Sequence, residues 1–507
     1  MMAHILLDGQ SLDLQQLVAA ARSGQEVEIT AAALGRVERA SAFVEDLVRR
    51  RAVVYGVTTG FGKFSETVIS PEASAELQVN LIRSHAAAVG PPLPEDVTRA
   101  VMLLRANALA RGLSGIRVET LRLLVSMLNR RVHPVIPSQG SLGASGDLGP
   151  LAHMALVMIG EGRARFGESV LSGAEALSKA GLRPVQLAAK EGLALINGTQ
   201  VMTALGALAL CDSDIILRTA DVAAAMTMEA LRGIPAAYDS RIHAARAHRG
   251  QAQVAANLRR LLAGSSLTTR PGEVRVQDAY ALRCVPQVHG ACRDAWEYAR
   301  GVLEVEMNAA TDNPLVFADD QEILSGGNFH GEPVALALDF LAIALADLGN
   351  IGERRVERLV NPLLSGLPPF LTSRGGLNSG YMLVQYTAAS LASENKVLAS
   401  PASVDSIPSS AGQEDHVSMG TLAARKLAAV VENVLQIVAI ELLCACQAVE
   451  FVGPDGLAPA TAGVYALIRE EVPPLSVDRP PSPDIAKVAA LIKSGAIVRV
   501  ADEVCRG

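Results

Sequence analysis

Aromatic side chains are scarce in this sequence. Phe, Trp and Tyr make up only 3% of its 507 residues, although 50% of the residues are apolar. Ala and Leu therefore supply much of the apolar surface, and such small or unbranched residues favour closely packed helices over β-sandwiches. We expect a mainly α fold with enough apolar surface for a large buried core.

Cysteines are also few, and their spacing excludes two kinds of framework. None of the six belongs to a CxxC pair, and they form no regular disulfide pattern. Free thiols of this kind are typical of a cytoplasmic protein. The segment Met1–Asp13 has no basic segment ahead of its short apolar run, so we expect no secretion signal. The cysteines are Cys211, Cys284, Cys292, Cys444, Cys446 and Cys505.

Positive charge is not concentrated anywhere along the chain. The net charge is −7 and there is no basic run, which excludes the electrostatic footprint of a nucleic-acid-binding protein. Long uncharged runs are missing too, because acidic residues divide the apolar stretches 333–349 and 427–452, and we expect no membrane span. The nine histidines include no HExxH motif, so we expect no metal site.

Helical periodicity organises the chain. It predicts a central bundle of long helices, together with a smaller N-terminal part that is rich in loops. We expect residues 1–200 to carry the loops with the functional motifs and residues 201–507 to form the bundle and the C-terminal part. No linker separates them, so both belong to one continuous catalytic unit. The long helices are expected at about 201–231, 275–309, 333–360, 377–396 and 416–451.

Three small residues, Ala144-Ser145-Gly146, allow an unusual reaction of the backbone. Because they let the chain fold sharply on itself, the amide nitrogen of Gly146 can reach the carbonyl carbon of Ala144. Cyclisation with loss of two waters, one of them from the Ser145 hydroxyl, would leave an electrophilic alkene on an imidazolone ring. Taken alone, the tripeptide is compatible with an ordinary turn, and its glycine spacing fits neither a hydrolase nucleophile elbow nor a dinucleotide-binding loop.

The context of this tripeptide is more specific. Eight motifs occur in one order over about residues 5–500, and together they resemble the histidine and aromatic-amino-acid ammonia-lyase family. The resemblance implies that Ala144, Ser145 and Gly146 form the family's cofactor, 4-methylideneimidazol-5-one (MIO), and that no external cofactor is needed. The motifs are Tyr55–Gly62, Ser84-His85, Gly143–Leu148, Ala194–Thr199, Gln277–Arg283, Asp312–Pro314, Gly327–His330 and Gln413–His416.

The resemblance also assigns roles to residues around the electrophile. Tyr55 would be the base that removes the β-proton, which requires that the pKa of its phenol, ordinarily ~10, be lowered. Arg283 would clamp the substrate carboxylate, and Tyr280, three residues earlier, would share its helical face and its pocket. Asn197 would hold the MIO region and the carboxylate. Gln277 and Phe329 would line the pocket.

Two further positions concern the substrate side chain. His85 occupies the family's selectivity position, where a histidine is found in both histidine and tyrosine enzymes. Glu414 is more discriminating, because a carboxylate can pair with an imidazole N–H but offers nothing to a phenyl ring. The pair favours elimination of ammonia from L-histidine to give urocanate.

Other substrates and outcomes stay open on the residues alone. Val57-Thr58 and the two alanines Ala279 and Ala281 depart from the histidine-lyase pattern toward the tyrosine enzymes. A tyrosine or other aromatic ammonia-lyase, a 2,3-aminomutase, or a helical scaffold that has lost the chemistry are the alternatives. The resemblance further implies a homotetramer whose active sites share residues between subunits.

Overall fold

The structure, a computed structural model, describes residues 4–506, without the side chains of the last two. The predicted free thiol of Cys505 therefore lies outside the described residues. Within them there are twenty α-helices and only nine strands, each of two to four residues. The predicted mainly α fold is confirmed.

The chain forms two compact units whose segments alternate along the sequence. Unit 1 comprises residues 1–208, 300–339 and 401–425, and unit 2 comprises residues 209–299, 340–400 and 426–507. The first segment ends close to the division expected at residue 200, but two later segments also belong to unit 1. The residues expected around the electrophile thus fall in both units.

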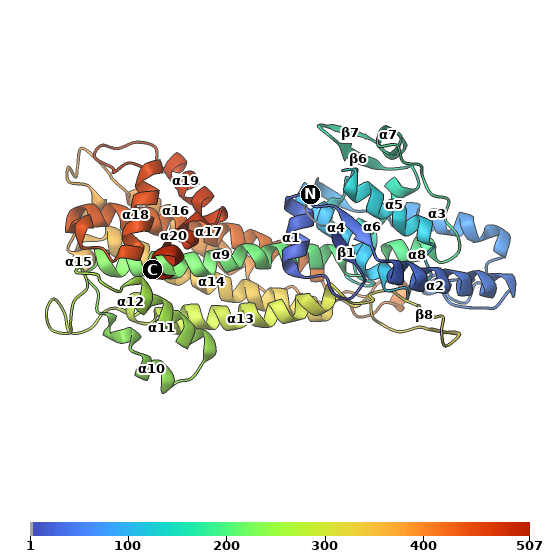
Figure 1. The fold of residues 1–507 in the computed structure, drawn as a ribbon, viewed down its shortest axis with the longest axis horizontal. Coiled ribbons are helices and arrows are strands. Elements are labelled where there is room, and N and C mark those ends of the chain that lie inside the picture. Colours follow the sequence, from blue (N-terminus) through green and yellow to red (C-terminus); the bar gives the residue numbers. More distant parts are fainter. Residues whose placement is uncertain (1–3, 507) are drawn as a thin grey trace. The chain divides into compact units, whose positions relative to one another are not determined.

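Unit 1 is built around α4 (Glu95–Ala110). Every residue of this helix from Val97 to Ala110 is buried, and α1, α2 and α5 pack against it (Figure 1). Two buried polar side chains of α4, Arg105 and Asn107, hold other segments of the unit through hydrogen bonds. The remaining early helices of unit 1 are α1 (Leu14–Arg22), α2 (Ala31–Arg49), α3 (Ser74–His85), α5 (Val118–Asn129), α6 (Leu148–Met158), α7 (Gly173–Lys179) and α8 (Glu191–Ile196).

Only small sheets accompany these helices. One is a parallel pair, two are antiparallel pairs, and one is an antiparallel sheet of three strands. The strands are β1 (Ile5–Leu7), β2 (Val27–Ile29), β3 (Val89–Pro92), β4 (His133–Pro134), β5 (Pro137–Gln139), β6 (Arg163–Phe166), β7 (Ser169–Ser172), β8 (Leu315–Phe317) and β9 (Glu322–Leu324). The β6–β7 hairpin and α7 form one edge of unit 1 (Figure 1).

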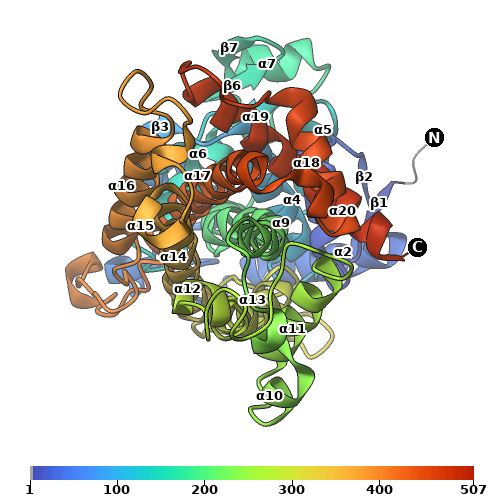
Figure 2. The ribbon, with the colours of Figure 1, turned by 90° about the vertical axis from the view of Figure 1, so that its left-hand side faces the viewer.

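Four long helices pass through the boundaries between the segments: α9 (Gln200–Ala230), α13 (Val285–Glu306), α14 (Glu332–Val360) and α17 (Gly420–Val452). In unit 2 they form a bundle, and α9 and α17 lie side by side at its centre (Figure 2). Its other helices are α10 (Ser240–Ala244), α11 (Arg249–Leu261), α12 (Tyr280–Arg283), α15 (Pro362–Ser365), α16 (Met382–Leu398), α18 (Pro459–Glu471), α19 (Ser482–Lys493) and α20 (Ala496–Arg506).

Polar contacts fix how the bundle helices of unit 2 face one another. The guanidinium of Arg355 donates to the carboxylate of Glu441 at 2.6 and 2.9 Å, and both residues are fully buried. Asp221 similarly accepts from His289 and Arg293, each at 2.8 Å. Because buried charges must be paired, these contacts specify the packing of α9, α13, α14 and α17.

The helix expected over 275–309 is interrupted, which corrects the prediction. Four residues form α12, and α13 begins only at Val285. The break has a local cause, because Pro286 in the first turn of α13 has no amide hydrogen with which to continue the preceding turn.

Three helices of the described residues are long and apolar enough to span a membrane, contrary to the expectation from the acidic residues within them. By length and composition α9, α14 and α17 could each cross a membrane, despite the acidic residues that interrupt α14 and α17. Between 67% and 78% of their most apolar stretches is buried inside the protein. Packing within the helical core therefore accounts for most of their apolar surface.

Candidate active site

A cavity of about 1030 Å³ opens in unit 1. Its lining comes from loops and helix ends that are far apart in the sequence, including the Gly-rich segment after Tyr55, the end of α3, the end of α8 and the loop before α17. Six residues expected at the site line it: Tyr55, His85, Ser145, Asn197, Phe329 and Glu414.

The Ala144-Ser145-Gly146 loop is tightly turned at one side of this cavity. Gly143 and Gly146 form an antiparallel bridge across it and have φ of +84° and +71°. Gly146 also bridges to Gly198, and a Cβ at Gly146 would lie 2.1 Å from the Gly198 carbonyl oxygen. A side chain at 146 is therefore excluded both by backbone conformation and by space.

Asp147 directly follows this loop and anchors it to other segments through its carboxylate. The sequence did not identify it as a site residue. Its carboxylate accepts from the first amides of α9, those of Val201 and Met202, each at 2.9 Å, and from the hydroxyls of Ser141 and Thr421. Burial raises the pKa of Asp147, and these hydrogen bonds oppose that rise. The available signal was its place beside the tripeptide, but apart from Ser141 its partners come from two other segments, the start of α9 and Thr421.

Tyr55 and Glu414 share one wall of the cavity. The Tyr55 hydroxyl accepts from the backbone N–H of Gly62 at 3.5 Å, and a Cβ at Gly62 would lie 3.6 Å from Oε1 of Glu414. Burial raises the pKa of Tyr55, and the negative charge of Glu414 raises it further, whereas the Gly62 hydrogen bond lowers it. The expected lowering of this pKa is therefore wrong for the chain by itself.

His85 ends α3 and presents one nitrogen to the cavity. Its Nδ1 lies 2.8 Å from the carbonyl oxygen of Leu81, and because a carbonyl only accepts, Nδ1 carries the proton. The neutral ring then keeps an unprotonated Nε2, which can accept a hydrogen bond from an occupant of the cavity.

Asn197 is 2% exposed and lies at the C-cap of α8. Its Nδ2 donates to Oδ1 of Asp312 at 3.2 Å and to the backbone oxygen of Asn313 at 3.1 Å. Its Oδ1 is buried and has no hydrogen-bond partner among residues 4–506. The residue thus lines the cavity and carries one buried amide oxygen that accepts no hydrogen bond from the described residues.

Of the other expected residues, Ala144 and Gly146 flank Ser145 in its loop, whereas the remaining three belong to unit 2 and line no part of this cavity. Gln277 and Arg283 line a separate pocket of about 340 Å³. Tyr280 and Arg283 share a face of α12, as expected, with the guanidinium carbon 4.5 Å from the ring centroid. Tyr280 is nevertheless 69% exposed, and Nε of Arg283 is buried without a partner in the described part of the chain.

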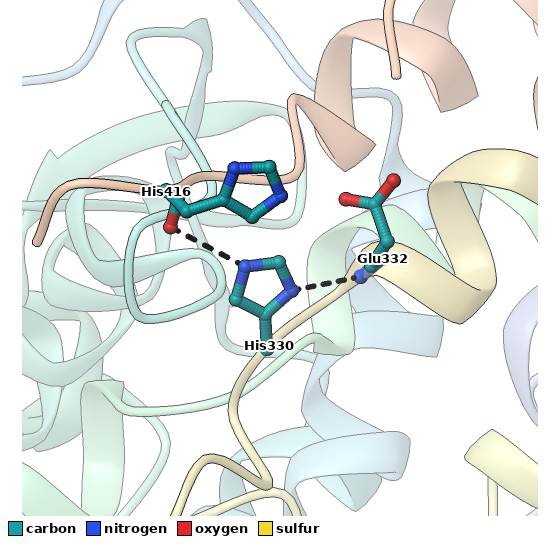
Figure 3. A group of neighbouring side chains, drawn as sticks. All are labelled: His330, Glu332 and His416. Carbon is teal, nitrogen blue, oxygen red and sulfur yellow. Dashed lines mark hydrogen bonds between the residues drawn. The ribbon is translucent and has the colours of Figure 1, made fainter. Parts of the chain in front are cut away.

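His330, Glu332 and His416 form a cluster that could resemble a metal site (Figure 3). Their ligand atoms all lie within 4.8 Å of one another. Both nitrogens of His330 are also engaged, Nδ1 with the amide of Glu332 and Nε2 with the carbonyl of His416, each at 3.3 Å. In this conformation the cluster links two loops, and the absence of a metal site stays a prediction.

The family profile described as aromatic amino acid lyase matches residues 12–470. The chain belongs to the aromatic amino acid lyase family. Close relatives within it carry one name: histidine ammonia-lyase of Symbiobacterium thermophilum is 64% identical over 98% of both chains. Histidine ammonia-lyase of Alkaliphilus oremlandii is 56% identical over 99% of both.

Solved structures of the family share this fold across several named activities. Histidine ammonia-lyase from Trypanosoma cruzi has a TM-score of 0.93 at 47% identity, covering 99% of this chain and 96% of its own. A tyrosine aminomutase from Streptomyces globisporus has a TM-score of 0.95 at 39% identity, covering 99% of each chain. Because enzymes with different names in this family share the fold so closely, the cavity residues have to distinguish the substrate.

Proposed function

We propose that this lyase eliminates ammonia from L-histidine to give urocanate. The observation that carries the proposal is that Glu414 and His85 line the same cavity as Ser145. A carboxylate accepts from an imidazole N–H, and the free Nε2 of His85 accepts from another donor. The relatives named histidine ammonia-lyase, at up to 64% identity over nearly the whole chain, support the same substrate.

The electrophile would be MIO, formed from Ala144, Ser145 and Gly146. The loop fits this group, because the positive φ of Gly143 and Gly146 brings the chain back on itself and Ser145 faces the cavity. When formed, the group captures the substrate's amine and turns it into a better leaving group.

The chain's own side chains would supply the rest of the chemistry. Tyr55 takes the β-proton on its phenolate oxygen, so its pKa, raised in the isolated chain, has to fall when a cation enters the cavity. The ammonium group of the substrate is such a cation. Glu414 and His85 orient the imidazole ring, and Phe329 lines the cavity beside them.

We further propose that a neighbouring subunit completes the site. Arg283, Tyr280 and Gln277 come from unit 2 and line no part of the cavity, and Tyr280 is 69% exposed, so its ring is accessible to another copy of the chain. The guanidinium would bind the substrate carboxylate in two-point contact. The assembly would be a homotetramer with shared sites. The free thiols of the described cysteines agree with a place in the cytoplasm.

The deciding experiment offers the purified chain L-histidine, L-tyrosine and L-phenylalanine separately and follows ultraviolet absorbance. We expect urocanate from histidine at a kcat/KM well above that for coumarate or cinnamate formation. A preference for tyrosine would favour the alternative tyrosine lyase, and β-tyrosine as the product would favour an aminomutase. An intact mass lower than the translated mass by two waters tests the cofactor independently.

A further inference from the structure

A single buried carboxylate contacts both ends of α8. Asp312 Oδ2 accepts from Nζ of Lys190, the N-cap residue of α8, at 2.7 Å. Asp312 Oδ1 accepts from Nδ2 of Asn197, the C-cap residue, at 3.2 Å. All three residues are at most 2% exposed, so both contacts of Asp312 are shielded from solvent.

These contacts determine which way the amide of Asn197 faces. Its Nδ2 lies against two acceptors, the Asp312 carboxylate and the backbone oxygen of Asn313. The reverse orientation would place an oxygen against two oxygens, and Oδ1 of Asp312 would keep only the backbone N–H of Asn313 as a donor, at 2.7 Å. The amide oxygen is thereby directed away from Asp312, and it is the atom of this side chain that has no partner among the described residues.

Two buried cations, Arg105 and Lys190, lie near Asp312. Nη1 of Arg105 donates to the backbone oxygen of Asn197 at 2.6 Å, which fixes the peptide that leads to Gly198. Burial lowers the pKa of Arg105 to about 10, which leaves it charged at neutral pH. Burial also lowers the pKa of Lys190, while the charge of Asp312 and its hydrogen bond oppose that lowering. The backbone and the side chain of Asn197 are thus each held by a charged group.

We propose that Asp312, paired with Lys190, is a positioning residue for the reaction and acts through Asn197. It holds the amide of Asn197 in one orientation, so that the oxygen can accept a hydrogen bond from the substrate beside Ser145. The inference rests on the proposed function, because it needs an amino acid bound in this cavity. Holding the acceptor before substrate arrives lowers the cost of ordering it on binding.

A purely structural ion pair would predict different behaviour. Removing one partner of a buried pair destabilises a protein because it leaves an uncompensated charge, whereas removing both charges together restores stability. A positioning role adds a dependence on Asn197 that stability alone does not have.

The test is a double-mutant cycle between Asp312 and Asn197, read as kcat/KM on the wild type's preferred amino acid. We expect Asp312→Asn to lower kcat/KM by about 100-fold. Asn197→Ala should also lower it, and the double variant should be no worse than Asn197→Ala alone. Losses that multiply would overturn the proposal. The matched control is Glu441→Gln, which removes the anion of the buried pair in unit 2 and should act additively with Asn197→Ala.

A second pair of variants separates positioning from folding. Lys190→Met combined with Asp312→Asn should regain the Tm lost by Asp312→Asn but keep its low kcat/KM. If activity returned together with Tm, the pair would be structural only. A wild-type enzyme inactive on all three amino acids would refute the proposed function instead. The Asn197–Asp312 contact would then be tested by the same double-mutant cycle measured as Tm, and additive changes in Tm would overturn the contact.

Discussion

The cavity of unit 1 and the α12 segment of unit 2 differ in how far their expected site residues are buried. In the cavity, Asn197 is 2% exposed and its amide has fixed partners, and the loop before α6 is pinned through Asp147. On α12, Tyr280 is 69% exposed and Arg283 stacks on it with its Nε unpartnered. The first region is covered by its own chain, whereas the second leaves the Tyr280 ring exposed to another surface.

The difference indicates a division of labour within the proposed site. The reactive group and the residues that face the substrate side chain come from one preorganised unit. The carboxylate clamp comes from a segment that the single chain leaves exposed at Tyr280, which is what we expect of a segment that completes a neighbouring subunit's site. The predictions below test this contrast.

The largest effect should come from Ser145→Ala. Without the hydroxyl the second water cannot be lost and the electrophile cannot form, so the loss of kcat should exceed the ~10²–10⁴-fold typical for removal of a general base. The intact mass should equal the translated mass minus a single water at most. The matched control is Ser141→Ala in the same loop, which removes a hydroxyl bonded to Asp147 and should keep the two-water deficit. Substantial turnover by Ser145→Ala would contradict the proposed chemistry.

The next effect tests the sharing of sites between subunits. Tyr55→Phe should lose ~10²–10⁴-fold in kcat while keeping the two-water mass deficit, and Arg283→Gln should also be nearly inactive. Co-assembled at equal amounts, the two variants should regain about one quarter of wild-type activity, because random pairing joins an intact cavity to an intact clamp at about one site in four. Mixed oligomers as inactive as either parent would place the whole site within one chain.

Sequence could predict the cavity residues better than it could predict their environment. Tyr55, His85, Asn197 and Glu414 stand in motifs that a family resemblance identifies, and the structure lines one cavity with them. Their partners lie in other segments: Lys190 carries no signal in its own neighbourhood, because only folding brings it to Asp312.

The same limitation explains the expectations that failed. The fall in the Tyr55 pKa was inferred from its role, but the pKa depends on burial and on the charge of Glu414, which local sequence does not encode. The break before α13 could have been predicted, since Pro286 marks it. The apolar residues of α9, α14 and α17 do not by themselves tell a buried bundle helix from a membrane span, because both require the same composition.

A smaller effect should sharpen the role of Glu414. Glu414→Gln keeps the shape of the side chain but removes a charged hydrogen bond worth roughly 1.5–3 kcal/mol, which corresponds to about 10- to 100-fold in kcat/KM on L-histidine. Turnover of L-tyrosine should change much less, since a phenol ring gains nothing from the carboxylate charge. The measurement is the ratio of kcat/KM for the two amino acids in each enzyme. Equal losses on both would remove Glu414 as the determinant of substrate choice.

The smallest effect is a shift in the pH profile of the same variant. The negative charge of Glu414 raises the pKa of Tyr55, so removing the charge lowers that pKa, and the phenolate forms at lower pH. The rising limb of kcat/KM against pH should therefore move to lower pH in Glu414→Gln, by less than about one pH unit. Titration of the substrate is common to both enzymes and cancels in the comparison. Ser409→Ala, which removes a 3.2 Å hydrogen bond to the Glu414 carboxylate but keeps its charge, should leave the limb in place. A limb that stays fixed in Glu414→Gln, or moves to higher pH, would mean that Glu414 does not raise the pKa of Tyr55. The cavity would then lack the electrostatic coupling between Tyr55 and Glu414 that distinguishes it from α12.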